Sequence, residues 1–184
     1  MVWDNDNLIN VLKSSGVVVI PTDTLYGILG SALDENVVEK IYEIRKRRPD
    51  KPCIILIGDI NDISKFSIDL TEKQKQELQK NWPGPVSVVL DCVDEKFGYL
   101  HRGTNTLAFR LPANGALKDL LLKTGPLIAP SANTEGNTPA RNIQEAKKYF
   151  GDKVDLYVDG GEIEGKASKV IKLNTDGTVV VLRE

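Results

Sequence analysis

The first group of chemically capable side chains follows a short apolar run near the N-terminus. Residues 17–20 read Val-Val-Val-Ile, and the next residues are PTDTLYG. Strand ends are where ligands bind in open sheets, so two hydroxyls, a carboxylate and a phenol would arrive there together. Thr22 and Thr24 are therefore candidates for contacts to a polar substrate. The structural alternative is a capped turn in which Thr22 and Asp23 satisfy local backbone groups.

A second group is a run of cations at the end of a helical pattern. Arg45, Arg47, Arg48 and Lys51 fall within one helical turn and the loop after it. This density suits a polyphosphate better than a single carboxylate, and arginine adds paired donors to phosphate oxygens. The structural alternative is a solvated helix end whose cations complement the helix dipole. A position directly before the apolar run at residues 53–57 favours a binding role.

Two further segments place polar groups beside apolar runs. Residues 129–133 read Ala-Pro-Ser-Ala-Asn, and Ser131, Asn133 and free N–H groups can bind phosphate or carboxylate oxygens without proton chemistry. A plain turn is the structural alternative for this segment. Arg110 is a lone cation in the apolar stretch AFRLP. Such arginines usually have an anionic partner, either a protein carboxylate or a substrate.

Several familiar catalytic patterns are absent from the sequence, among them GxSxG, HExxH, the Walker loop and GxGxxG. Cys53 and Cys92 form no CxxC pair and His101 is the only histidine, so we expect no zinc site and no metal ligands. What the pattern predicts is a positively charged pocket with hydroxyls at strand ends. Such a pocket suits reactions accelerated by positioning and by stabilising charge on phosphate.

The composition indicates one globular domain over residues 1–184. With 24 basic against 26 acidic side chains the formal net charge is −2, so phosphate chemistry must rest on a local patch. The N-terminal residues show neither a leader-peptide pattern nor an apolar stretch of membrane length. We therefore expect a cytoplasmic protein that does not bind a membrane.

The helices and strands expected from the apolar patterns interleave without a regular period, which predicts an α+β fold with a mixed, twisted sheet covered by helices. Segments 94–105 and 134–142 lack periodicity and are expected to be functional loops. Helices are expected at residues 8–12, 37–48, 117–122 and 143–150, with two shorter ones before Trp82. Strands are expected at residues 17–20, 53–57, 86–90, 107–111 and 127–129, and near Leu156, Ile171 and Val180.

Taken in order, seven segments resemble the YrdC/TsaC family, most closely its short bacterial single-domain branch. They are PTDTLYG, RKRRPDKPCIILI, WPGPVSVVL, LAFRLP, IAPSANTEGNTPAR, VDGG and VLR. The chain departs from the family pattern at Arg45, where lysine is usual, at Arg48, where proline is frequent, and at Ser168-Lys169, where many members have Ser-Thr.

The resemblance implies a YrdC-like fold and a nucleotidyltransferase, an L-threonylcarbamoyladenylate synthase. L-threonine, bicarbonate and ATP with Mg²⁺ would give the adenylate and pyrophosphate. A separate threonylcarbamoyl transferase complex would then modify the anticodon-adjacent adenosine of tRNA, and direct tRNA binding by this chain stays open. The implied threonine-binding residues are Thr22, Thr24, Arg110 and Ser168. The implied nucleotide-binding residues are Arg45, Arg47, Lys51, Ser131, Asn133, Arg141 and Arg183, of which Arg47, Lys51 and Ser131 would be catalytic.

Two other functions stay open at this level. A module that binds double-stranded RNA or tRNA without catalysis would need the same basic patch, although the slightly acidic balance argues against it. The second is the YrdC-like part of a hydrogenase-maturation carbamoyltransferase, which uses carbamoyl phosphate. That part resembles this chain but is accompanied by zinc-binding motifs, which this sequence lacks.

Overall fold

A computed structural model describes residues 2–184 of the protein. The strands are β1 (Val18–Pro21), β2 (Tyr26–Ser31), β3 (Ile54–Leu56), β4 (Val86–Asp91), β5 (Thr106–Arg110), β6 (Leu127–Ile128), β7 (Leu156–Tyr157), β8 (Lys169–Leu173) and β9 (Val179–Arg183). The α-helices are α1 (Asp6–Lys13), α2 (Glu35–Arg45), α3 (Glu72–Asn81), α4 (Gly98–His101), α5 (Gly115–Thr124) and α6 (Ile143–Phe150). Short 3₁₀ helices are η1 (Ile60–Phe66), η2 (Glu95–Phe97) and η3 (Gly151–Lys153).

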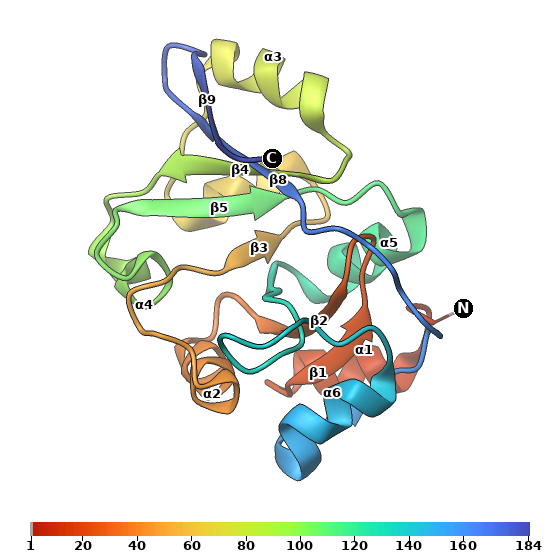
Figure 1. The fold of residues 1–184 in the computed structure, drawn as a ribbon. Helices are drawn as coiled ribbons and strands as arrows, with labels where there is room; N and C mark the ends of the chain where they lie inside the picture. The colour runs from red at the N-terminus through yellow and green to blue at the C-terminus, as the bar shows by residue number, and fades with distance from the viewer. Residues whose placement is uncertain (1) are drawn as a thin grey trace.

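The strands form one nine-stranded sheet in the order β7-β1-β2-β6-β3-β5-β4-β8-β9 (Figure 1). The pairs β1–β7, β3–β5 and β4–β8 are parallel, and the other neighbours are antiparallel. The mixed sheet with helices that the sequence predicts is therefore confirmed. Within the described residues, no helix is both long enough and apolar enough to cross a membrane.

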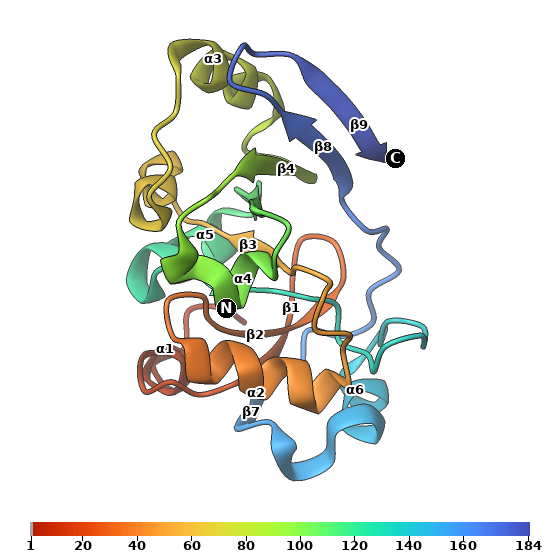
Figure 2. The ribbon, with the colours of Figure 1, turned by 90° about the vertical axis from the view of Figure 1, so that its left-hand side faces the viewer.

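Strand β1 is buried on both faces, which explains its unbroken apolar sequence. Val19 packs in one core cluster with Val37 of α2, whereas Val18 and Ile20 pack in a second cluster with Leu117 of α5. Helices α2 and α6 thus lie on one side of this end of the sheet, and α1 and α5 on the other (Figures 1 and 2). Each fully buried Val or Ile stabilises the fold by about 1.5–3 kcal/mol relative to exposure.

Helix α2 ends at Arg45, three residues before the end that the sequence pattern predicts. Lys46 takes a left-handed conformation with φ 51°, and the Arg47 N–H donates to the Tyr42 carbonyl to close the helix. Pro49 also disfavours a helical conformation at Arg48. The predicted helical continuation is therefore wrong, and the cations after Arg45 lie on a loop.

Two parts of the chain differ from the expectation, namely strand β2 and segment 94–105. Strand β2 was not expected, because Gly27 and Gly30 weaken the strand signal. A Cβ at Gly30 would lie 2.3 Å from Val37 Cγ1, so this glycine lets α2 approach the sheet closely. Segment 94–105 was expected to be a loop, but it contains η2 and α4, which are anchored by buried Phe97 and Leu100.

Candidate active site

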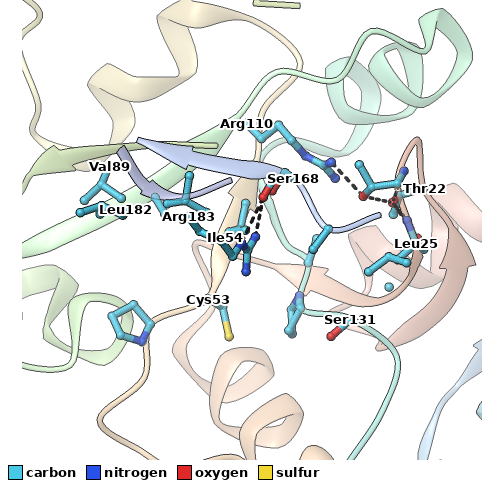
Figure 3. Close-up of a pocket in the computed structure, with 18 of the residues that line it drawn as sticks. Thr22, Leu25, Cys53, Ile54, Val89, Arg110, Ser131, Ser168, Leu182 and Arg183 are labelled. Carbon is cyan, nitrogen blue, oxygen red and sulfur yellow. Dashed lines mark hydrogen bonds between the residues drawn. The ribbon is translucent and has the colours of Figure 1, made fainter. Parts of the chain in front are cut away.

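A cavity of about 440 Å³ lies between the β1–β2 turn, the loop after α2 and strands β5, β8 and β9 (Figure 3). Its volume is within the range of roughly 300–1,000 Å³ that is usual for small-molecule sites. Arg47, Arg110 and Arg183 line it together with hydroxyl groups and apolar side chains. None of the described residues in this lining is acidic. The cavity is thus locally positive in a protein whose net charge is −2.

Most of the site residues predicted from the sequence meet at this cavity. Those in the lining are Thr22, Thr24, Arg47, Arg110, Ser131, Ser168 and Arg183. Four others are not in the lining, and each has another partner described below: Arg45, Lys51, Asn133 and Arg141.

The turn between β1 and β2 fixes Thr22 and presents Thr24. The Thr22 hydroxyl donates to the Leu25 carbonyl at 2.7 Å and accepts from the N–H groups of Thr24 and Leu25, each at 3.2 Å. This is the capped turn that the sequence offered as the structural alternative. The one hydroxyl hydrogen of Thr22 is already used in the bond to the Leu25 carbonyl. Thr24 Oγ1 accepts from Arg110 Nη1 at 2.9 Å and lies 3.2 Å from Thr22 Oγ1. Thr24 can therefore contact a substrate together with Arg110.

Arg110 of β5 is buried and reaches toward the same turn (Figure 3). Its Nη2 lies 3.1 Å from Asp23 Oδ1, which is within ion-pair distance but not aligned for a hydrogen bond. Its Nε has no hydrogen-bond partner among residues 2–184. Burial lowers the pKa of Arg110, and the nearby Asp23 acts in the opposite direction. Because Arg110 lines the cavity, its planar guanidinium is suited to a second anion, such as a substrate carboxylate.

Arg45 supports the segment at residues 129–133 and does not face the cavity. Its side chain is 2% exposed, and it donates to the Asn133 carbonyl at 3.0 Å and to Asn133 Oδ1 at 3.1 Å. Asn133 Oδ1 also accepts from Ser131 Oγ at 2.7 Å. Burial, followed by the charge of Arg47, lowers the pKa of Arg45 to about 10. The structure therefore places Arg45 and Asn133 where they position Ser131, and their expected nucleotide contacts stay predictions.

Arg47 reaches the cavity from the loop after α2. Its Nε donates to the Lys51 carbonyl at 3.0 Å, and its Nη2 donates to the Pro52 carbonyl at 2.8 Å. The Tyr42 hydroxyl donates to the same Lys51 carbonyl at 2.7 Å. The Tyr42 ring centroid lies 5.9 Å from the Arg47 guanidinium and 4.0 Å from that of Arg102. Tyr42 and Arg102, which the sequence pattern did not single out, thus support the loop that presents Arg47.

Lys51 and Arg141 point to acidic side chains outside the cavity lining. Lys51 Nζ lies 2.6 Å from Glu135 Oε1, in the segment between β6 and α6. The exposed Arg141 guanidinium lies 3.6 Å from Glu145 and 3.7 Å from Glu162. The nucleotide contacts of Lys51 and Arg141 therefore stay predictions. In this geometry, each side chain has to leave its carboxylate before it can bind a phosphate.

Strands β8 and β9 close the cavity on the side opposite the β1–β2 turn. Arg183 of β9 donates to the Ser168 carbonyl from Nε at 3.2 Å and from Nη2 at 2.7 Å (Figure 3). The Ser168 hydroxyl lies 2.8 Å from the Ser87 hydroxyl in a buried pair. Arg183 is therefore positioned for an anionic ligand, whereas Ser168 lines the cavity with its hydroxyl already hydrogen bonded.

The Sua5/YciO/YrdC family model, described as "Telomere recombination", matches residues 10–184. The chain belongs to the Sua5/YciO/YrdC family. The family resemblance of the seven sequence segments and the YrdC-like fold are thereby confirmed.

Relatives within the Sua5/YciO/YrdC family carry a common name. The threonylcarbamoyl-AMP synthase of Pyrococcus abyssi is 34% identical over 94% of this chain and 51% of its own length. The threonylcarbamoyl-AMP synthase of Marinobacter nauticus is 30% identical over 88% of this chain and 87% of its own. The crystal structure of P. abyssi Sua5 complexed with L-threonine aligns at a TM-score of 0.85 with 31% identity, covering 100% of this chain and 54% of that chain. This chain thus spans about half the length of the P. abyssi relative.

Proposed function

We propose that the chain is a threonylcarbamoyl-AMP synthase, which converts L-threonine, bicarbonate and ATP into L-threonylcarbamoyladenylate and pyrophosphate. The cavity lining carries this proposal, because three arginines meet there beside the hydroxyls of Thr24 and Ser131, with no acidic side chain among the described lining residues. These groups bind carboxylate and phosphate oxygens. The names of the P. abyssi and M. nauticus relatives support the same activity, and the threonine complex of P. abyssi Sua5 supports threonine as a ligand.

The chemistry of this reaction suits a site that positions anions and supplies no nucleophile of its own. The threonine amine joins the bicarbonate carbon with loss of water, which gives a carbamate. A carbamate oxygen then bonds to the α-phosphorus of ATP, and the bond from this phosphorus to the bridging oxygen breaks to release pyrophosphate. Both reactants are negatively charged, so the protein lowers the barrier by holding them together and offsetting their repulsion.

Each residue of the lining has a role in this proposal. Arg110, with Thr24 beside it, would bind the threonine carboxylate. Arg47, from the loop after α2, and Arg183, from β9, would bind phosphate groups of the nucleotide. Ser131 would contact the reacting groups between the two substrates, held in place by Asn133 through the 2.7 Å hydrogen bond.

Magnesium would reach this site together with the nucleotide. Among residues 2–184, no three His, Cys, Asp or Glu side chains are grouped in a way that could hold a metal ion. Mg²⁺ is commonly held by substrate phosphates and water with few protein ligands, so the side chains present fit a nucleotide-borne ion. When bound there, Mg²⁺ would offset the negative charge of the phosphates.

We further propose that the protein acts in the cytoplasm and passes the adenylate to a separate threonylcarbamoyl transferase complex that modifies tRNA. The alternative of an RNA-binding module without catalysis is less well supported. The segment after α2 that carries Arg47, Arg48 and Lys51 is called the basic loop below. Two of its exposed cations are paired with carboxylates, Arg48 with Asp50 and Lys51 with Glu135. A phosphate backbone would have to compete with both carboxylates.

The test of this function is release of pyrophosphate by the purified chain supplied with ATP, Mg²⁺, bicarbonate and L-threonine. We expect release that requires both threonine and bicarbonate and that proceeds without tRNA. Reactions that lack one substrate at a time serve as controls. Pyrophosphate release that ignores threonine, or no release while the protein binds RNA tightly, would contradict the proposal.

A further inference from the structure

Glu135 places a carboxylate directly on the basic loop after α2. Its Oε1 lies 2.6 Å from Lys51 Nζ, and its Oε2 accepts from the backbone N–H of Arg48. The Glu135 side chain is 21% exposed, whereas that of Lys51 is 48% exposed. One carboxylate therefore occupies an ammonium and a backbone amide of the loop at the same time.

These donors are of the kind that binds phosphate. A lysine ammonium and a backbone N–H are common partners of phosphate oxygens, and they meet carboxylate oxygens at nearly the same distances. The hydrogen bond from Lys51, followed by that from the Arg48 N–H, lowers the pKa of Glu135. At neutral pH the side chain is thus an anion and repels any other anion that approaches the loop.

The backbone around Glu135 is anchored independently of its side chain. The Glu135 N–H donates to the Arg45 carbonyl at 2.9 Å. Asn133 Nδ2 donates to the Thr134 carbonyl at 2.9 Å and to the Asn137 carbonyl at 2.8 Å. The carboxylate can therefore leave Lys51 by rotation of its own side chain, without refolding the segment.

We propose that Glu135 sets the affinity of this site for the nucleotide by competing with its phosphates for Lys51 and the Arg48 N–H. This inference rests on the proposed function, because it takes the basic loop as the phosphate side of the cavity. A phosphate that reaches Lys51 displaces the Glu135 carboxylate, since two anions cannot share the same donors without repulsion. Glu135 thus acts on affinity through Lys51 and takes no part in bond making or breaking.

Glu135→Gln tests the competition, because glutamine keeps an oxygen that can accept from the Arg48 N–H and removes the charge opposite Lys51. Calorimetric titration with ATP and Mg²⁺ should show affinity tightened by about two- to fivefold, the range expected for an exposed ion pair. Threonine affinity should stay unchanged, because Arg110 and Thr24 are on another wall of the cavity. Structural damage would weaken ATP binding and cannot produce this gain.

The control variant is Glu72→Gln on α3. Glu72 Oε1 lies 2.7 Å from Lys75 Nζ, and neither residue lines the cavity, so the variant removes the same charge from a Glu–Lys pair elsewhere on the protein. It should leave ATP affinity at the wild-type value. In a Lys51→Met background, Glu135→Gln should give a clearly smaller gain, since the contested ammonium is gone and only the Arg48 N–H and the charge repulsion remain.

Three results would overturn the inference. They are unchanged or weaker ATP affinity in Glu135→Gln, an equal gain in Glu72→Gln, and a gain in the Lys51→Met background that is as large as in the wild-type background. If any of them occurs while the wild-type chain still releases pyrophosphate in the presence of threonine, only the role of Glu135 is wrong. A wild-type chain that binds no ATP would overturn the proposed function and this inference together.

Discussion

Arg45 and Arg47 are separated by one residue, yet they have different surroundings. Lys46 turns the chain out of α2 between them. Arg45 is left beneath Asn133, with its Nε and Nη2 on the Asn133 oxygens, whereas Arg47 emerges at the cavity. Arg45 therefore stabilises the site through its hydrogen bonds to Asn133, and Arg47 can bind a ligand.

Substitution of these two arginines by methionine should separate stability from binding. Arg45→Met leaves the buried Asn133 carbonyl without a donor and Asn133 Oδ1 with the Ser131 hydroxyl alone, and should lower the free energy of unfolding by about 1–3 kcal/mol. Arg47→Met should leave that free energy near its wild-type value and weaken ATP binding by about 1–3 kcal/mol, with threonine binding much less affected. Urea unfolding and calorimetry with each ligand measure both effects. Wild-type stability with lost ATP binding in Arg45→Met would return Arg45 to the nucleotide site.

At the scale of elements, the long connection between β7 and β8 holds the β1–β2 turn in place. It runs from one end of the sheet toward the other (Figures 1 and 2). The Tyr26 hydroxyl donates to the Gly161 carbonyl and accepts from the Gly160 N–H, both at 2.8 Å. A Cβ at Gly165 would lie only 1.6 Å from the Thr24 carbonyl oxygen. The close approach of this connection to Thr24 therefore requires glycine at position 165.

Gly165→Ala should displace the connection or the turn, because the atom that it meets is backbone and not a flexible side chain. We expect a loss of stability of about 1–3 kcal/mol, as for other overpacked sites, together with weaker threonine binding. Gly115→Ala, at the first residue of α5 with no atom within 4 Å of the added Cβ, is the matched control and should be neutral or slightly stabilising. Thermal unfolding and titration with threonine measure the two effects. Equal stability and equal threonine affinity in the two variants would contradict the prediction.

The elements with continuous apolar runs, such as β1 and β4, could be predicted because burial on a strand leaves a plain signal in the sequence. The left-handed conformation at Lys46 could not be predicted, since the usual sequence signal for such a helix end is a glycine and this position is a lysine. The cluster of candidate residues at strand ends was predicted as well. The support of Ser131 by Arg45 and the pairing of Lys51 with Glu135 were not, because these partners lie 86 and 84 residues apart. Contacts at such separation are decided by how the elements pack.

At the scale of the whole molecule, residues from two separate parts of the sheet line the cavity. Strands β6 and β3 lie between β2 and β5 in the sheet order, yet Arg110 of β5 bonds to Thr24 in the turn before β2. Arg183 of β9, at one edge of the sheet, also lines this cavity. Substrate groups bound there would therefore contact segments from both halves of the chain.

Arg110→Lys probes this junction, because lysine keeps the positive charge but has a single ammonium in place of a planar fork. One ammonium cannot contact Thr24, Asp23 and a substrate carboxylate with the geometry that Arg110 offers. The variant should fold, because the charge beside Asp23 is kept, and its threonine affinity should fall by about 1–3 kcal/mol while ATP affinity changes little. Calorimetry with each ligand and urea unfolding measure the two properties separately. A variant with normal threonine affinity and a large loss of stability would show that Arg110 only joins the two parts of the sheet, and the threonine carboxylate would then need another partner in the cavity.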